Sequence, residues 1–317
     1  MTLNLIRITN HSAWFIGILL LIGSILLFVG GPDDYSSRSF KRFWDMGHII
    51  YFALFTVSLS RWSPVSRMPL IRQWAVILII TLLVGVSIEL MQYGTTRTPN
   101  TGDIIRDLAG SLLALVFGPL GKKVESIKRR LSLQISVIVL MLVLIWPLVK
   151  SVVDEAVAHY QFPLLSGFET PFEVDRWQGG DKLSVESLSS ISAGKLLKLS
   201  LTTDKYSGAS LRYFEGNWSS ARTLKISVYN PDKDPLQLIC RIHDHQHTEG
   251  YQEYADRYNR RFLLLPGWNQ LEIGLDEVEG APSGRNMDMS RVRSVGLFTV
   301  ALPEPRIIYI DEVRLSY

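Results

Sequence analysis

The stretch LSLQISVIVLMLVLIWPLVKSVV, residues 131–153, separates two parts of the chain that are built for different solvents. A helix needs about 20 apolar residues to cross the hydrocarbon core of a bilayer, and this stretch meets that length. Before it, apolar residues fall in long runs with few charges. After about residue 165, charged and turn residues interrupt the chain every few positions. The sequence therefore predicts a membrane-embedded first half and a water-exposed second half.

Four further apolar runs precede this stretch, and two of them are shorter or begin with ionisable residues. The predicted membrane spans are residues 12–30, 45–62, 73–93, 103–121 and 131–153. The first run is longer than the apolar part of a usual signal peptide and has no small-x-small cleavage site, so we expect it to be retained. We predict an all-α bundle of about five transmembrane helices over residues 1–157, followed by a linker at 158–166.

The basic residues beside these runs favour one orientation. With a cytoplasmic N-terminus, nine Lys or Arg residues flank the predicted helices inside the cell and four lie outside. The inner group is Arg7, Arg61, Arg67, Arg72, Lys122, Lys123, Lys128, Arg129 and Arg130, and the outer group is Arg38, Lys41, Arg42 and Arg97. We expect a multi-pass inner-membrane protein, and five crossings would place its C-terminal domain in the periplasm or outside the cell.

Composition restricts the possible partners and cofactors. The net charge is +3, and much of the excess lies beside apolar runs, where it sets topology rather than binding nucleic acid. Cys240 is the only cysteine, which excludes an intrachain disulfide and a multi-cysteine zinc site. The chain has no HExxH motif. We expect no cofactor, no metal and no nucleic-acid partner.

Ionisable and polar side chains gather at the ends of the predicted membrane helices. Such groups cost several kcal/mol within a bilayer unless they are paired or hydrated, so they are candidates for function. The predicted membrane polar cluster is Asp45, His48, Tyr51, Glu89, Gln92, Arg97, Asp103, Arg106 and Asp107. In the topology above, all of these residues lie at the outer membrane surface. Gly110, Ala114 and Gly118 follow at four-residue spacing, which predicts close approach of a neighbouring helix.

The residue types in this cluster support three roles. One is an ion-pair and hydrogen-bond network that holds the helices together, such as Asp103 with Arg106 or Glu89 with Arg97. A second is binding of a lipid or glycan, with Arg97 holding a phosphate or carboxylate. A third is catalysis, with His48, Glu89 or Asp103 as acid or base. The sequence leaves these alternatives open, and with them whether the protein is an enzyme.

Two of these stretches resemble the VanZ-like membrane proteins. They are DMGHIIYFALF at 45–55 and IELMQYGTTRTPNTGDIIRDLAGSLLALVFG at 88–118, and the resemblance covers about residues 12–120. Met46 stands where many relatives carry Lys, and Asp107 stands where they usually carry Asn. The resemblance implies a membrane location and the residue set above, but no reaction.

The second half shows short runs rich in strand-forming residues, separated by turn residues. The predicted strands are 195–202, 209–213, 224–229, 236–243, 261–265, 270–273, 295–300 and 307–315. This pattern predicts an all-β antiparallel jelly-roll sandwich over residues 167–317. The stretches GFETPFEVDRW, GWNQLEIGL and IIYIDEVRLSY look like those of galactose-binding-like carbohydrate-binding modules. That resemblance implies a sugar ligand.

The most polar run in the chain is RIHDHQHTEGYQEYADRYNRR, residues 241–261. Its mixture of aromatic rings with donors and acceptors is typical of sugar-binding sites. The predicted glycan-binding residues are Asp244, His247, Tyr254, Asp256, Arg257, Asn259 and Arg261. On a strand, His243, His245 and His247 would share one face, which raises a metal site as an alternative. A further alternative is a solvated loop whose shape is fixed by Asp and Arg pairs.

Together these observations predict a VanZ-like inner-membrane protein that recognises a cell-envelope glycan or a lipid-linked glycan. Membrane lipid and that glycan are the expected partners, and the sequence names no protein partner. The alternatives are a membrane enzyme that modifies such a glycan and a non-catalytic scaffold subunit of an envelope assembly.

Overall fold

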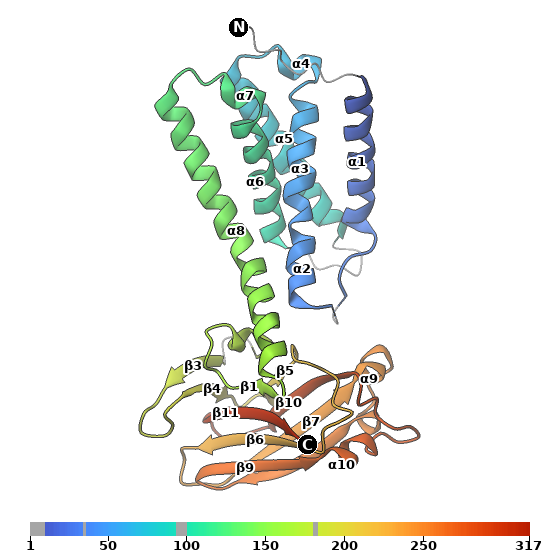
Figure 1. Cartoon of the computed structure of the whole chain (residues 1–317), viewed down its shortest axis with the longest axis vertical. Coiled ribbons are helices and arrows are strands. Elements are labelled where there is room, and N and C mark those ends of the chain that lie inside the picture. The colour runs from blue at the N-terminus through green and yellow to red at the C-terminus, as the bar shows by residue number, and fades with distance from the viewer. Residues whose placement is uncertain (1–9, 34–35, 93–99, 180–182) are drawn as a thin grey trace. The chain divides into compact units, whose positions relative to one another are not determined.

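A computed structural model gives the fold of the chain, which divides into two compact units, Met1–Val149 and Lys150–Tyr317. The residues described are 10–33, 36–92, 100–179 and 183–317. The first unit is helical, and the second is built mainly of β-strands (Figure 1). This confirms the predicted change from an α to a β architecture along the chain.

The helical unit is formed by eight described helices. They are α1 (Asn10–Phe28), α2 (Arg38–Asp45), α3 (Gly47–Leu59), α4 (Ser63–Ser66), α5 (Leu70–Gln92), α6 (Thr101–Phe117), α7 (Pro119–Lys122) and α8 (Ile127–Gln161). The Ser37 hydroxyl caps α2 by accepting a hydrogen bond from the Phe40 backbone N–H at 3.2 Å. Gly118 and Pro119 end α6, because proline lacks the N–H that the helix would need to continue.

The prediction of about five membrane-spanning helices was wrong in number. Helices form in all five expected ranges, but among the described residues only α5 and α8 are both long and apolar enough to cross a bilayer. The turn at Met46 separates α2 from α3, which leaves α3 with 13 residues, and the break at Gly118 leaves α6 with 17. At 1.5 Å per residue, these helices fall short of a hydrocarbon core about 30 Å thick.

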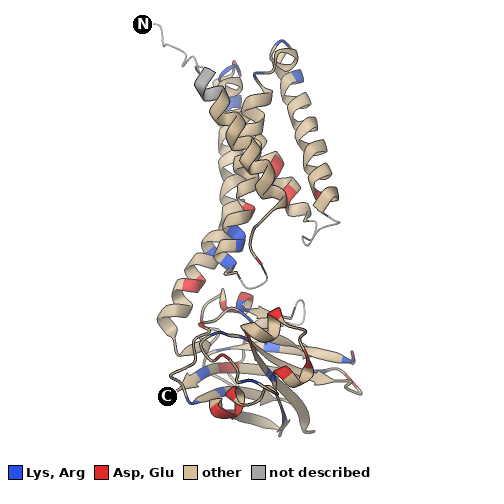
Figure 2. Ribbon diagram, turned by 90° about the vertical axis from the view of Figure 1, so that its right-hand side faces the viewer, with Lys and Arg blue, Asp and Glu red and all other residues tan. Residues whose placement is uncertain are grey.

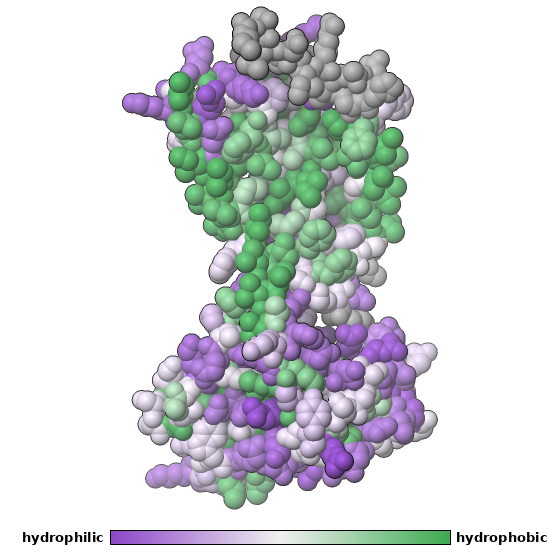
Figure 3. Space-filling view, viewed as in Figure 1, coloured by the Kyte–Doolittle hydropathy of each residue, from purple (hydrophilic) through white to green (hydrophobic). Residues whose placement is uncertain are grey.

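The helices of this unit pack closely through small and hydroxyl-bearing residues. A Cβ atom on Gly110 of α6 would lie 2.3 Å from the Ile49 carbonyl oxygen of α3, so glycine is required for this approach. The Ser111 hydroxyl contacts the hydroxyls of Thr56 and Thr81, each at 2.8 Å, which links α6 to α3 and α5. The predicted close approach is thus confirmed at Gly110. Hydrophobic residues cover the middle of the helical unit on the face shown in Figure 3.

The second unit is an antiparallel sandwich of two sheets. Its strands are β1 (Leu164–Ser166), β2 (Trp177–Gln178), β3 (Leu183–Ser187), β4 (Lys195–Leu201), β5 (Tyr206–Leu211), β6 (Thr223–Asn230), β7 (Leu236–Asp244), β8 (Tyr258–Leu264), β9 (Gly267–Gly274), β10 (Val292–Val300) and β11 (Arg306–Ser316). One sheet has the order β3-β4-β11-β6-β9, with β1 paired to β11, and the other has the order β2-β5-β10-β7-β8. All eight predicted strands are present, and β1, β2 and β3 were not predicted.

The core of the sandwich lies between the two sheets and follows the period-2 alternation of the strands. Leu224, Ile226 and Val228 of β6 are fully buried, and the residues between them are less buried. Cys240 of β7 lies in the same core, where burial raises the pKa of its thiol to about 12. As the sequence predicted, this cysteine occupies an apolar strand.

The last turns of α8 belong to the sandwich unit. Arg176 donates hydrogen bonds from Nε and Nη2 to the Asp154 carboxylate at 2.9–3.1 Å, and both side chains are fully buried. Arg176 Nη1 also donates to the Leu165 carbonyl oxygen at 2.9 Å. The linker expected at residues 158–166 contains the end of α8 and strand β1. The structure therefore ties Asp154, a helix residue, into the sandwich.

Candidate functional site

A groove of about 880 Å³ lies on the outer face of the five-stranded sheet, opposite the side that packs in the core. This volume lies within the range of small-ligand sites, about 300–1,000 Å³. Strands β2, β5, β10, β7 and β8 all contribute to its lining, together with the short helical turn Tyr254–Asp256 before β8.

Two rows of neighbouring residues cross the strands and form the floor of the groove. One row is Ser210, Gly296, Arg241 and Asn259, and the next is Gly208, Phe298, Ile239 and Arg261. Each row runs through β5, β10, β7 and β8 in that order, because adjacent members are direct cross-strand partners. The register of the sheet therefore brings together side chains that lie far apart in the sequence.

Two glycines allow close packing in the middle of this floor. A Cβ atom on Gly296 would lie 3.4 Å from Arg241 Nε and 3.1 Å from the Ser210 hydroxyl oxygen. A Cβ atom on Gly208 would lie 2.1 Å from the Leu297 carbonyl oxygen, a distance that no side chain tolerates. The Arg241 guanidinium and the Ser210 hydroxyl thus lie over Gly296, in the place that a side chain there would need.

Three polar atoms of the groove are buried without a hydrogen-bond partner among the described residues. They are Arg241 Nε, Arg257 Nε and Asn259 Oδ1. Buried polar groups in folded proteins nearly always have partners, so these three side chains have unmet hydrogen-bonding capacity beside the groove.

Aromatic rings line the groove near two of its edges. Tyr254 is 71% exposed, and the Arg257 guanidinium lies 5.4 Å from the centroid of its ring. Tyr206 of β5 is 62% exposed and packs edge-on against Phe298 at a centroid distance of 6.2 Å. Exposed rings beside hydrogen-bonding groups can stack on the apolar faces of sugar rings.

Four of the seven predicted glycan-binding residues line this groove. They are Tyr254, Arg257, Asn259 and Arg261. The other three, Asp244, His247 and Asp256, lie in an internal network around Arg285 and do not line it. The prediction from sequence missed Phe298 and Tyr206, because strand pairing is needed to place β5 and β10 beside the polar run, and it did not select Arg241, the first residue of that run.

The network around Arg285 fixes the shape of the segment between β7 and β8. Its guanidinium donates to Asp244 at 2.6 and 2.9 Å and to Asp256 at 2.6 and 3.0 Å. Burial would raise the pKa of Asp244, but hydrogen bonds from Arg285 and from the backbone N–H groups of Asp288 and His247 outweigh it and hold this pKa below its ordinary value. The Asp and Arg pairs expected in a shaped loop are therefore present.

The expectation that His243, His245 and His247 share one strand face was wrong. Strand β7 ends at Asp244, whose carboxylate accepts a hydrogen bond from the His247 backbone N–H at 3.0 Å and caps helix α9 (His245–Glu249). The change from strand to helix breaks the period of two on which that expectation rested. Within the described part of the chain, no three His, Cys, Asp or Glu residues are grouped so as to hold a metal ion.

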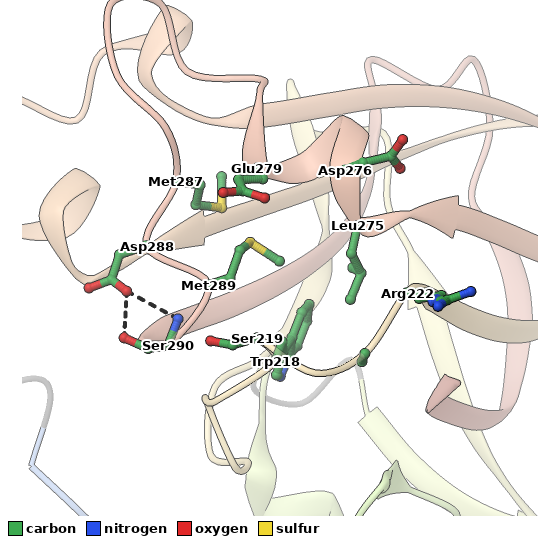
Figure 4. A pocket seen from close by; sticks show the side chains of 11 residues that line it. Trp218, Ser219, Arg222, Leu275, Asp276, Glu279, Met287, Asp288, Met289 and Ser290 are labelled. Carbon is green, nitrogen blue, oxygen red and sulfur yellow. Dashed lines mark hydrogen bonds between the residues drawn. The ribbon is translucent and has the colours of Figure 1, made fainter. Parts of the chain in front are cut away.

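A second concavity of the sandwich, about 670 Å³, contains Trp218, Leu275, Met287 and Met289 (Figure 4). Three carboxylates also line it, those of Asp276, Glu279 and Asp288, and Asp288 accepts hydrogen bonds from the Ser290 hydroxyl at 2.5 Å and from the Ser290 backbone N–H at 3.0 Å. We place the candidate ligand site in the groove on the five-stranded sheet, because exposed aromatic rings and polar side chains line that groove together.

In the helical unit, the structure brings five residues of the predicted polar cluster together. His48 Nδ1 lies 2.8 Å from Asp107 Oδ1, and both side chains are buried. Arg106 is paired with Asp103, and Arg106 Nη2 lies 3.4 Å from Asp45 Oδ2. His48 Nε2 lies 3.9 Å from Asp103 Oδ2, which connects the two pairs.

The remaining members of the predicted cluster make other contacts. Glu89 Oε2 accepts a hydrogen bond from the Asn100 backbone N–H at 2.6 Å, where α6 begins. Gln92 Nε2 donates to the Leu27 carbonyl oxygen at 2.8 Å, and the Tyr51 hydroxyl lies 2.9 Å from Ser24 Oγ. Arg97 lies outside the described residues. Several Lys and Arg residues gather at the end of the unit that carries α4 and α7 (Figure 2).

An apolar groove of about 360 Å³ lies beside the polar cluster, between α1 and the α2–α3 segment. Leu19, Ile22 and Leu26 of α1 line it, and so do Phe43 and His48. A side chain of the polar cluster is thus in contact with a hydrophobic groove.

Comparisons with known proteins concern the sandwich. No family model matches the chain, and no characterised protein matches its sequence. The VanZ-like resemblance of residues 12–120 is therefore not supported by these comparisons. The C-terminal β-sandwich is similar to solved carbohydrate-binding modules and to parts of agarases.

Three of these solved structures illustrate the extent of the similarity. A family 11 carbohydrate-binding module from Clostridium thermocellum, in complex with a mixed-linked tetrasaccharide, is 15% identical, with 48% of this chain and 94% of that chain covered and a TM-score of 0.37. A family 28 module specific for non-crystalline cellulose is 9% identical, with 49% and 93% covered and a TM-score of 0.34. An exo-beta-agarase is 15% identical, with 48% and 24% covered and a TM-score of 0.40. Similarity of this extent does not establish a family or a ligand for this chain.

Proposed function

We propose that this chain is an inner-membrane protein whose β-sandwich binds a glycan of the cell envelope, free or lipid-linked, in the groove of the five-stranded sheet. The observation that carries the proposal is the groove itself. It combines exposed aromatic rings with buried polar atoms that have no partner among the described residues. Sugars present the matching surfaces, because their C–H faces stack on rings and their hydroxyls and acidic groups take hydrogen bonds.

Glycan-array binding by the full chain, purified in detergent, tests this function. Tyr254→Ala removes a ring that lines the groove, and we expect it to lower affinity about tenfold, a typical effect of losing an aromatic anchor. Tyr251→Ala is the matched control, because Tyr251 is 97% exposed and does not line the groove. Equal binding by both variants and the unaltered chain, or no binding to any glycan, would contradict the proposal.

The helical unit supports the membrane part of the proposal. Helices α5 and α8 meet the length and hydropathy of membrane spans, and α1 is a shorter apolar helix over its described residues. With a cytoplasmic N-terminus and an odd number of crossings, the sandwich lies outside the cytoplasm. The polar cluster around His48 and Arg106 then contacts the head group of the lipid that carries the glycan, and the adjoining apolar groove holds part of its hydrocarbon chain.

A second candidate function, modification of the lipid or glycan, rests on the His48 and Asp107 pair. A buried carboxylate that hydrogen-bonds one imidazole nitrogen fixes the tautomer and leaves the other nitrogen to exchange a proton with a substrate. Asp107→Asn, which keeps the size of the side chain, should then abolish modification of the lipid or glycan, while glycan binding by the sandwich is retained. Unchanged turnover in this variant would exclude the proposed role for the pair.

A further inference from the structure

Every formal charge on the described lining of the sandwich groove is positive. Arg241, Arg257, Arg260 and Arg261 line it, and no Asp or Glu among the described residues does. Arg260 is the one member of this set with a described carboxylate partner, Glu277 at 3.0 Å. The groove therefore carries cationic groups that no described carboxylate of the sandwich neutralises.

Arg241 is the least solvated of these cations. Its Nε atom is buried without a hydrogen-bond partner in the described structure, and its guanidinium lies 5.6 Å from the Phe298 ring centroid. Burial and then the charges of Arg257 and Arg212 hold the pKa of Arg241 below its ordinary value. A partly buried cation among like charges is stabilised when a ligand supplies the missing negative charge.

The arginines of the groove also favour a ligand rich in acceptors, while Asn259 Oδ1, which has no partner among the described residues, can accept a hydrogen bond from a sugar hydroxyl. A guanidinium has five N–H donors and no acceptor, so the four arginines contribute donors only. Gln178 offers an amide oxygen at the β2 edge, but that oxygen already accepts a hydrogen bond from Arg212 at 2.7 Å. A neutral sugar hydroxyl both donates and accepts, whereas a carboxylate or phosphate only accepts and matches planar guanidinium groups.

We infer that the groove takes an anionic glycan, a sugar chain that bears carboxylate or phosphate groups, with Arg241 and Arg257 contacting the anionic group. This inference rests on the proposed function and specifies its ligand. Tyr254 beside Arg257 supplies a ring for the sugar, and Gly296 lets the Arg241 side chain lie across the floor of the groove.

Binding of matched polymers by the full chain in detergent tests the charge preference. One probe is polygalacturonate, and its control is the fully methyl-esterified polymer, which has the same backbone without charge. A second anionic probe is poly(glycerol phosphate), so that carboxylate and phosphate are separated. We expect at least one anionic probe to bind more than tenfold tighter than the methyl ester, and this preference to shrink as salt screens the charges.

Two substitutions assign the preference to named residues. Arg257→Gln and Arg241→Gln remove charge but keep hydrogen-bonding atoms, and each should weaken anionic binding about tenfold or more. Arg314→Gln is the matched control, because Arg314 lies on β11 of the other sheet and is half exposed. Arg257 is not in the core, so a folded Arg257→Gln variant, verified by its circular dichroism spectrum, keeps the test valid if Arg241→Gln fails to fold.

The outcomes separate this inference from the function on which it rests. Anionic probes that bind no tighter than the methyl ester, or an Arg257→Gln variant that keeps full preference, would overturn the inference. In that case glycan binding that depends on Tyr254 would still support the proposed function. No binding to any glycan would overturn both.

Discussion

Two glycines of the helical unit show how the role of a residue depends on the atoms packed around it. Gly110 is the clearest case in the helical unit, since any side chain there would meet the Ile49 carbonyl oxygen of α3. Gly17 of α1 is the opposite case, because nothing lies within 4 Å of a Cβ atom built on it. The same residue type thus matters for helix packing at Gly110 of α6 but not at Gly17 of α1.

Gly110→Ala should therefore lower the stability of the helical unit by about 1–3 kcal/mol, the usual effect of overpacking. Gly17→Ala, on the same reasoning, should leave stability unchanged or slightly raise it. Thermal unfolding of both variants in the same detergent gives the comparison. Equal melting temperatures would show that α3 and α6 do not meet at Gly110.

His243 gives the sandwich a specific dependence on pH. Burial, and then the neighbouring His247, lower the pKa of His243 from its ordinary value near 6.5 to about 3. The unfolded chain then binds a proton that the folded chain does not, so stability is complete above pH 6.5 and falls as the pH drops toward 3. One such proton costs at most about 1.4 kcal/mol per pH unit.

We expect His243→Gln to flatten the fall in melting temperature of the sandwich between pH 6.5 and 4.5. Part of the dependence of melting temperature on pH should remain. The pKa of His247 is also lowered, mainly by burial, so the stability that neutral His247 contributes is likewise lost as the pH falls. Calorimetry of the full chain provides the measurement, with the exposed His159→Gln as control. A slope that His243→Gln leaves unaltered would show that His243 titrates normally in the folded chain.

At the scale of elements, the Asp154 and Arg176 pair makes the end of α8 part of the sandwich. A fragment that begins at residue 150 keeps both partners, whereas one that begins at residue 165 loses Asp154 and leaves Arg176 with only the more distant Glu173 carboxylate, 3.9 Å away. Removing one partner of a buried pair costs about 3–5 kcal/mol.

Asp154→Ala in the 150–317 fragment should lower its free energy of unfolding by about that amount. The double variant Asp154→Leu with Arg176→Met should recover only part of the loss, because the apolar pair needs no charge compensation but Glu173 and the Leu165 carbonyl oxygen lose their contact with Arg176. Urea titration of the three proteins tests both statements. If Asp154→Ala unfolds at the same urea concentration as the unaltered fragment, α8 does not stabilise the sandwich.

The sequence predicts an element well when the pattern that determines it lies within a few neighbouring residues. The alternation in TLKISVYN is local, and β6 forms where it predicts a strand. The lengths of α3 and α6 were overestimated, because hydropathy ignores the turn at Met46 and the break at Gly118. Four groove residues could be predicted from one polar run, whereas Arg241 and Phe298 meet only through strand register, and Arg285 lies far along the chain from its partners.

On the scale of the whole molecule, the number of membrane crossings decides which compartment the sandwich reaches. An odd number, with the N-terminus inside, exports it, and the five basic residues in KKVESIKRR, residues 122–130, oppose translocation of the end of α7 and the start of α8. We therefore expect an alkaline phosphatase fused after Tyr317 to be active and a green fluorescent protein fused there to be dark. The reverse pattern would place the sandwich in the cytoplasm and remove its access to an envelope glycan.

The buried thiol of Cys240 has a practical consequence for mapping this topology. Maleimides react with the thiolate, and a side chain with a pKa of about 12 in the core of a sandwich supplies almost none at neutral pH. The unaltered chain therefore serves as the unlabelled control in maleimide experiments. A cysteine can then be introduced on any connecting segment and treated with an impermeant maleimide in intact cells. Modification places that segment outside the membrane, and lack of modification places it inside.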